Sequence, residues 1–327
     1  MVILELIEKT SALAEGDTIT IPLHSPDEAD LAAAWCARTG NTLIAADHTS
    51  VTIRRGRPAD PISDLPADRR PGARLWLYTN FDCNLACDYC CARSSPKAER
   101  RALGVDRVRE IAKAAPAAGV REILLTGGEP FILPDLGQIV ADCTAALPTT
   151  LLTNGMLFRG HRLQTLQAMP RDRLTLQISL DSATADLHDA HRGKGTWAKA
   201  VAGIHTALDE GFIVRVAATL TTDDRSEENE LRSFLDSLGI PQRHQVVRPL
   251  ARQGAADSGL ELTVETLIPE VTITAEGVYW HPVGADNDEQ LVTRDIFPLD
   301  SAIALVQEQF RAHRATADAA ARTFPCA

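Results

Sequence analysis

Short apolar segments alternate with amphipathic ones along residues 73–252. Six segments rich in Leu, Val and Ile predict buried strands: Arg74–Thr79, Glu122–Thr126, Thr149–Thr153, Thr175–Leu180, Ile213–Leu220 and Gln245–Pro249. Between them, apolar residues recur at helical spacing, as in the faces that begin at Val105, Trp197 and Leu231. Such an alternation predicts a parallel sheet covered by helices. Six units are too few for a complete eight-fold barrel, so the pattern predicts a partial (β/α)6 TIM barrel.

The segments on either side of this core follow different patterns. Residues 1–57 combine two helical stretches with three alternating strands, which predicts a small α/β two-layer domain. Residues 58–72 contain four prolines and predict a linker. Residues 253–327 lose the rhythm and predict a short α+β extension, with a hairpin turn at Glu276-Gly277 and a helix that begins near Asp300.

Composition and charge limit the classes of protein to which the chain can belong. Hydrophobic residues make up 45% and charged residues 24% of the sequence, which are values typical of globular proteins. No apolar run reaches the roughly 18 residues of a membrane helix, and acidic residues stand where a signal peptide would be basic. We therefore expect a cytoplasmic protein without a membrane partner. The net charge of −11 argues against nucleic acid as a partner.

Four of the seven cysteines lie between Cys83 and Cys91, directly after the first predicted strand. Clustered thiols in a reducing compartment indicate a metal site rather than disulfides. A closed zinc site usually takes four ligands in two separated pairs, and no second pair occurs here. A four-iron cluster held by Cys83, Cys87 and Cys90 would instead leave one iron without a protein ligand. The spacing favours the cluster and leaves a structural metal site as the alternative.

The three cysteines, spaced four and three apart with Tyr89 before the third, resemble the signature of the radical S-adenosylmethionine (SAM) superfamily. The resemblance implies that Cys83, Cys87 and Cys90 bind a [4Fe-4S] cluster whose open iron is chelated by SAM. It also implies reductive cleavage of SAM to a 5′-deoxyadenosyl radical, which abstracts hydrogen from a substrate. An external donor such as flavodoxin or ferredoxin would supply the electron.

Two further motifs match the pattern of this superfamily. Gly127-Gly128-Glu129-Pro130 ends the second predicted strand, where glycines let backbone groups approach a ligand closely, although the same text also suits an ordinary turn. Ser179 and Asp181 alternate and so project to one side of the fourth strand. The resemblance assigns SAM binding to Tyr89, Gly127, Gly128, Glu129, Pro130, Asn154, Ser179, Asp181, Arg192, Thr219 and Leu250.

Cys36, Cys91 and Cys143 are expected to be structural thiols, and His188 and His191 are expected to be surface or loop-packing residues. Cys326 stands alone near the end of the sequence and has no assigned role. Cys91 adjoins Cys90 and is expected to point away from it. Cys36 and Cys143 are expected to be small core residues. Three polar side chains of the last strands, those of Arg215, Gln245 and Arg248, either face the barrel interior and hold an acidic or amide substrate group or point outward.

The two ends of the chain carry resemblances of their own. The stretch that begins VTITAEG at Val271 resembles a SPASM or twitch extension without auxiliary-cluster cysteines, so no second cluster is expected. Residues 1–57 resemble small sulfur-carrier and sulfurtransferase domains but lack their reactive Cys-Pro. A docking or dimerisation module is therefore favoured there over persulfide carriage, with leader-peptide recognition as an alternative.

These resemblances together imply a radical SAM enzyme, with a ribosomally made peptide as the first choice of substrate. A small metabolite is the nearest alternative. The alternative that is not an enzyme is a non-catalytic iron-sulfur or zinc protein linked to sulfur trafficking.

Overall fold

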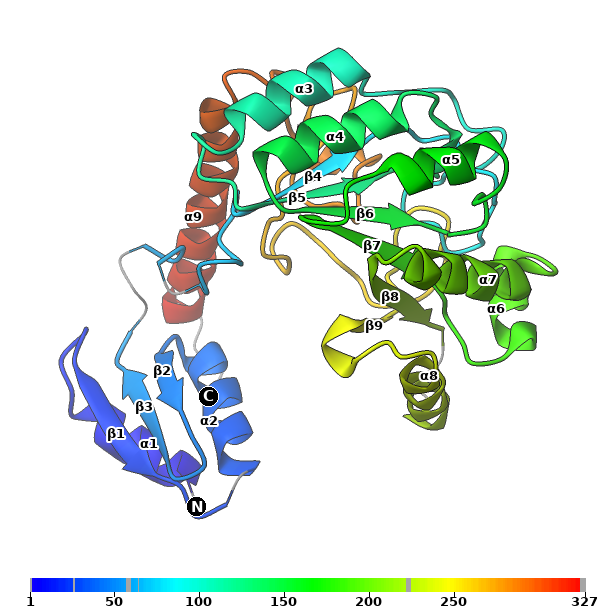
Figure 1. Ribbon diagram of the computed structural model, residues 1–327. Helices are drawn as coiled ribbons and strands as arrows, with labels where there is room; N and C mark the ends of the chain where they lie inside the picture. Colours follow the sequence, from blue (N-terminus) through cyan, green and yellow to red (C-terminus); the bar gives the residue numbers. More distant parts are fainter. Residues whose placement is uncertain (1, 26, 57–59, 64, 222–224, 324–327) are drawn as a thin grey trace. The chain divides into compact units, whose positions relative to one another are not determined.

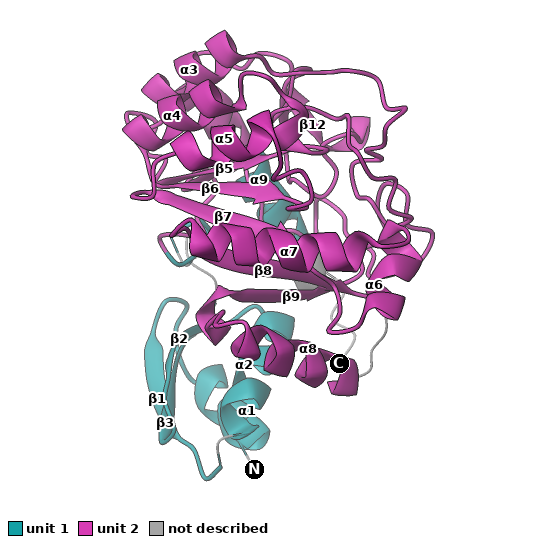
Figure 2. Ribbon diagram, turned by 45° about the vertical axis from the view of Figure 1, so that its right-hand side comes forward, with its two compact units in different colours: residues 1–66, 308–327 teal, residues 67–307 magenta. Residues whose placement is uncertain are grey.

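The computed structural model describes residues 2–25, 27–56, 60–63, 65–221 and 225–323. The chain divides into two compact units, residues 1–66 with 308–327 and residues 67–307 (Figure 2). Cys326 and part of the predicted linker lie outside the described residues.

The N-terminal part of the first unit, residues 2–56, contains a three-stranded antiparallel sheet with two helices (Figure 1). Its elements are α1 (Val2–Ser11), β1 (Thr18–Pro22), α2 (Asp27–Thr39), β2 (Thr42–Ala46) and β3 (Ser50–Arg54). The strand order is β1-β3-β2. One face of the sheet buries Ile21, Val51 and Ile53 against Leu6 and Ala32 of the helices. The alternation of apolar and polar residues predicted the three strands, because only one face of this sheet is buried.

The second unit is built on a sheet of nine strands in the order β12-β11-β10-β4-β5-β6-β7-β8-β9. Six consecutive strands of this sheet pair in parallel: β4 (Arg74–Tyr78), β5 (Glu122–Thr126), β6 (Thr149–Thr153), β7 (Leu174–Ser179), β8 (Ile213–Leu220) and β9 (Gln245–Pro249). These are the six strands that the apolar segments predict. The sheet is open, with β12 and β9 at its edges, as expected for an incomplete barrel.

Helices cover the outer face of this sheet (Figure 1). They are α3 (Val105–Ala114), α4 (Leu136–Ala146), α5 (His161–Ala168), α6 (Ala185–Arg192), α7 (Thr196–Asp209) and α8 (Arg225–Ser237), and α9 (Leu299–Thr323) follows the last strand. Short 3-10 turns occupy Pro130–Ile132, Gln242–His244 and Asp288–Gln290. No helix within the described ranges combines the length and apolar character needed to cross a bilayer.

The segment after β9 extends the main sheet. β10 (Thr272–Ile273) and β11 (Val278–Tyr279) form the predicted hairpin, and β12 (Leu291–Thr293) pairs with β11. β10 also pairs in parallel with β4, so that Thr272 lies opposite Trp76. The sequence predicted the hairpin but not this pairing, because a two-residue strand carries no sign of its distant partner.

Candidate active site

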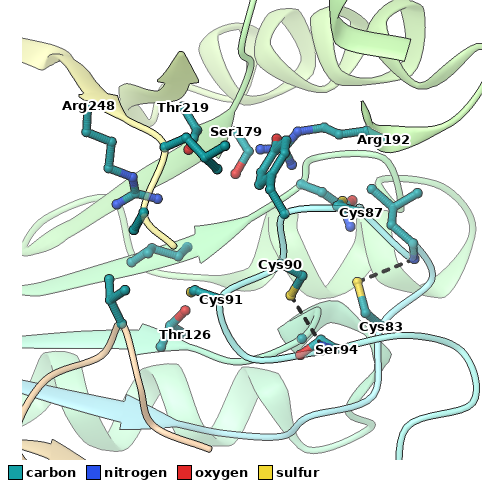
Figure 3. A pocket seen from close by; sticks show the side chains of 18 of the residues that line it. Cys83, Cys87, Cys90, Cys91, Ser94, Thr126, Ser179, Arg192, Thr219 and Arg248 are labelled. Atoms are coloured by element: carbon teal, nitrogen blue, oxygen red, sulfur yellow. Dashed lines mark hydrogen bonds between the residues drawn. The ribbon is translucent and has the colours of Figure 1, made fainter. Parts of the chain in front are cut away.

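A cavity of about 400 Å³ lies where the carboxyl ends of the parallel strands meet (Figure 3). In a parallel sheet the loops after successive strands gather at this end, so residues far apart in sequence converge there. The predicted residues that line it are Cys83, Cys87, Tyr89, Cys90, Gly127, Gly128, Asn154, Ser179, Arg192, Thr219 and Leu250. Three others lie behind its wall: Glu129, Pro130 and Asp181.

The cysteine loop that follows β4 presents its thiols to this cavity. Cys83 is buried, whereas Cys87 and Cys90 are half-buried. The Leu85 N–H donates to Cys83 Sγ at 3.4 Å, and the Ser94 N–H donates to Cys90 Sγ at 3.3 Å (Figure 3). Such hydrogen bonds stabilise negative charge on sulfur and help to set the properties of iron-sulfur sites. The backbone is therefore arranged to support thiolates at this loop.

Metal binding requires the thiolate form of these cysteines, and burial disfavours this negatively charged form. Burial raises the pKa of Cys83 to about 12 and that of Cys87 to about 11. A bound metal centre supplies the positive charge that deprotonates such thiols. Within the described ranges, no three His, Cys, Asp or Glu side chains converge to hold a metal ion. The three cysteines line one cavity, and three cysteine thiolates are the donor set of a four-iron cluster that leaves one iron without a protein ligand.

The two glycines of the Gly127-Gly128 turn let the end of β5 approach the cysteine loop. A Cβ on Gly127 would lie 2.4 Å from Asn80 Oδ1, and one on Gly128 would lie 2.2 Å from the Asp82 carbonyl oxygen. The Gly128 N–H donates to the Asn80 carbonyl at 2.9 Å. We expected these glycines to admit a ligand. Both do line the cavity, and they also fix the position of the loop that carries the thiols.

Glu129 ties the end of β5 to the end of β6. Its carboxylate accepts hydrogen bonds from the Phe131 N–H at 3.0 Å, the Asn154 N–H at 2.8 Å and the Thr153 hydroxyl at 2.7 Å. The side chain is fully buried, and this burial raises its pKa, whereas the hydrogen bonds act in the opposite direction. Glu129 thus holds Asn154 in the cavity wall through protein contacts.

Asp181 is the centre of a buried polar group beneath the cavity. It accepts from Arg192 Nε at 2.5 Å and Nη2 at 3.1 Å, from the Thr219 N–H at 3.0 Å and from the Tyr89 hydroxyl. The buried ring of His188 accepts from the Asp181 N–H at 3.2 Å, so His188 packs within the site and not on the surface.

The charge balance of this group decides what Arg192 can bind. Burial by itself would raise the pKa of Asp181, but the adjacent Arg192 guanidinium and the donated hydrogen bonds lower it below its usual value. Arg192 lines the cavity with its charge already paired to a carboxylate. Its contribution to ligand binding is therefore directed N–H hydrogen bonds, because its positive charge is already balanced by Asp181.

Substituting Asp181→Asn is expected to lower the free energy of unfolding at pH 7 by about 3 kcal/mol, because it leaves Arg192 buried without its counter-charge. Since the folded pKa of Asp181 lies below the unfolded value of about 3.9, its contribution is complete above about pH 4 and is lost as the pH falls further. Urea unfolding of both proteins should show a difference that shrinks below about pH 4. The exposed Asp106→Asn should behave like the parent within about 0.5 kcal/mol, and an equal loss in both variants would contradict the assignment.

The structure corrects the expectation for Cys91. Its side chain lines the cavity beside Cys90 instead of pointing away. The reason is local: consecutive turns close at this point, with Cys90 N–H bonded to the Cys87 carbonyl and Arg93 N–H to that of Cys90, so neighbours do not alternate as in a strand. Burial raises the pKa of Cys91 to about 11.

Several cavity residues were outside the sequence-based prediction. Those from beyond β9 are Ala251, Leu260, Leu262, His281 and Val283. They lie in the region where the alternation of strands and helices ends, and the only signal there was the resemblance of the stretch from Val271 to a SPASM or twitch extension. Arg248 does line the cavity, whereas the Gln245 side chain bonds to Asp236 and the Ile240 carbonyl, both at 2.8 Å.

Comparison with known proteins agrees with this geometry. The sequence pattern of the radical SAM superfamily matches residues 77–238, which run from β4 through α8. Two curated relatives are the antilisterial bacteriocin subtilosin biosynthesis protein AlbA of Bacillus subtilis, 33% identical over 172 residues, and the mycofactocin maturase MftC of Mycobacterium ulcerans, 30% identical over 184 residues. The matches cover 50% and 56% of this chain but 37% of AlbA and 49% of MftC, so the chain spans less than half the length of each.

A solved structure shares the fold. SuiB of Streptococcus suis bound to S-adenosylmethionine matches with a TM-score of 0.50 and 20% identity, over 59% of this chain and 44% of SuiB. SuiB bound to its precursor peptide SuiA matches with a TM-score of 0.50 and 18% identity, over 73% of this chain and 55% of SuiB. Residues 77–238 therefore form a radical SAM domain, and the chain belongs to the radical SAM superfamily.

Proposed function

We propose that this chain is a radical SAM enzyme that modifies a peptide, with a [4Fe-4S] cluster held by Cys83, Cys87 and Cys90. The observation that supports this most directly is that all three cysteines line one cavity together with most of the residues expected to hold SAM. When bound and reduced, the cluster supplies the electron that cleaves SAM to a 5′-deoxyadenosyl radical, as in this superfamily.

The residues around the cavity bind and orient SAM and keep water away. Ser179 and Thr219 offer hydroxyl groups, and Asn154 is fixed by Glu129, so polar contacts are available from three neighbouring strands. Arg192 is held by Asp181 in one orientation and so presents its guanidinium without further ordering. Leu85, Leu152 and Leu250 supply apolar wall, which limits access of water to reactive carbon.

A peptide substrate is supported by the kinds of protein that this chain resembles. AlbA serves the biosynthesis of a bacteriocin, and SuiB has been crystallised with a precursor peptide. In this chain, Leu260 and Leu262 join the cavity from the segment after β9, beside the exposed side chain of Arg248. Because Arg192 is already paired with Asp181, Arg248 is the exposed cation of this described lining, and it suits a peptide segment that carries an acidic group.

Anaerobic reconstitution tests the proposal directly. The protein is expected to take up about four irons per chain and to release 5′-deoxyadenosine when SAM and dithionite are added. A deuterated candidate peptide should pass deuterium into the 5′-deoxyadenosine. Iron uptake with SAM cleavage but with transfer from a small metabolite instead would contradict the peptide assignment, and zinc uptake without SAM cleavage would contradict the enzyme itself.

The proposal also gives a role to each segment of the chain. Residues 1–57 are proposed as a sulfur-carrier-like module that serves docking, residues 58–72 as a linker, and residues 73–252 as the partial barrel. Residues 253–327 are proposed as a twitch-like extension that completes the substrate end of the cavity. The contribution of residues after β9 to the cavity wall supports this role of the extension.

A further inference from the structure

A second hollow, which we call the basic cleft, lies on the other side of the cysteine loop. Its volume is about 730 Å³. Residues 84–86 and Asp88 of the cysteine loop form one part of it, and residues after β6 and around the α6–α7 junction form the rest. Apart from Leu85 and Arg192, which line both hollows, the residues of this cleft have no role in the chemistry proposed for the SAM cavity.

Three of the cationic side chains that line the basic cleft form no ion pair with the described residues of the chain. Arg159, Lys194 and Lys199 line it with exposed side chains, and none of the described residues forms an ion pair or side-chain hydrogen bond with them. The one acidic residue in the described lining, Asp88, is bonded to His191 at 2.9 Å. These three cations gather on a chain whose net charge is −11, so the cleft is a local exception to an acidic molecule.

The cysteine loop borders both the basic cleft and the SAM cavity. Leu85 and Arg192 line both hollows. Ala86, which stands directly before Cys87, is exposed and belongs to the lining of the cleft. A protein seated in the cleft would therefore contact the loop that carries the cluster ligands without occupying the SAM cavity.

We propose that the basic cleft is the docking site of an acidic, low-potential electron-transfer protein, an inference that rests on the proposed function. Opposite charges give such a transient complex its orientation and its speed of association. One electron passes from the reduced carrier, which is oxidised, to the centre bound by the cysteine loop, which is reduced. On an enzyme of net negative charge, these three clustered cations give an acidic carrier a local region of attraction.

The test reverses two of these charges in Lys194→Glu/Lys199→Glu. Calorimetric titration of the reconstituted protein with a purified bacterial flavodoxin is expected to show binding weakened roughly tenfold. The difference should vanish at about 1 M salt, where the Debye length is about 3 Å. Formation of 5′-deoxyadenosine driven by reduced flavodoxin should fall by a similar factor, whereas formation driven by dithionite, which needs no docking, should equal that of the parent.

A matched variant is available at the opposite ends of the strands. Lys113 on α3 and Arg121 before β5 are exposed cations, and Lys113→Glu/Arg121→Glu changes the net charge by the same amount. It should bind flavodoxin much as the parent does. Equal weakening in both double variants would overturn the proposal, because net charge and not the cleft would then set the affinity.

Two further outcomes would also overturn it. Unchanged flavodoxin affinity in Lys194→Glu/Lys199→Glu would place docking elsewhere. If the Lys194→Glu/Lys199→Glu protein is still reduced by flavodoxin but no longer turns over an acidic peptide, the cleft binds the substrate instead. The proposed function fails separately, if the parent protein does not cleave SAM even with dithionite.

Discussion

Cys87→Ser is expected to reduce iron uptake from about four per chain to background and SAM cleavage by at least about 100-fold. Serine keeps the shape of the side chain, but its hydroxyl is a hard donor that binds iron-sulfur clusters poorly in comparison with a thiolate. Cys87 lines the cavity on the side of Arg192, whose charge favours the thiolate there. Iron analysis and chromatography of 5′-deoxyadenosine measure both effects.

Cys143→Ala is the matched control for this loss. Cys143 is a fully buried thiol on α4, remote from the cavity lining, and burial raises its pKa to about 12. Its removal should leave iron content and SAM cleavage near those of the parent. A Cys87→Ser protein that still binds about four irons and cleaves SAM would show that the cluster has other ligands.

Gly128→Ala is expected to destabilise the protein by more than about 3 kcal/mol and to prevent cluster assembly. The added Cβ would lie 2.2 Å from the Asp82 carbonyl oxygen and 2.7 Å from that of Phe81, both of which belong to backbone that cannot rotate away. Either β5 or the cysteine loop has to move, and the thiols move with the loop. Urea unfolding and iron analysis report the two consequences separately.

Gly137→Ala shows what an added methyl does where space exists. Gly137 lies within α4, and its Cβ would meet only Thr165 Cγ2 at 3.5 Å, an ordinary contact. The substitution should stabilise the helix by about 0.5–1 kcal/mol, since alanine restricts the unfolded chain. A Gly128→Ala protein that unfolds at the urea concentration of the parent would refute the close approach of β5 to the cysteine loop.

Much of the fold could be predicted because its signals are local. The central parallel strands β5, β6 and β7 are largely buried on both faces and are therefore short apolar runs. Such runs located β4 to β9 to within a residue. The C-terminal strands carry weaker signals, because β10 has two residues and depends on pairing with β4. Cys91 was predicted wrongly since alternation was assumed where the chain makes successive turns.

The sequence by itself determined the superfamily, because three thiols within eight residues stay close in any fold and their spacing carries the chemistry. Only the tertiary structure decided which polar groups remain available to a ligand. Arg192 and Asp181 both fit a ligand-binding pattern along the chain, yet folding pairs them with each other and leaves Arg248 exposed at the cavity. The physical reason is that pairing depends on distances between side chains on different elements, which residue spacing does not contain.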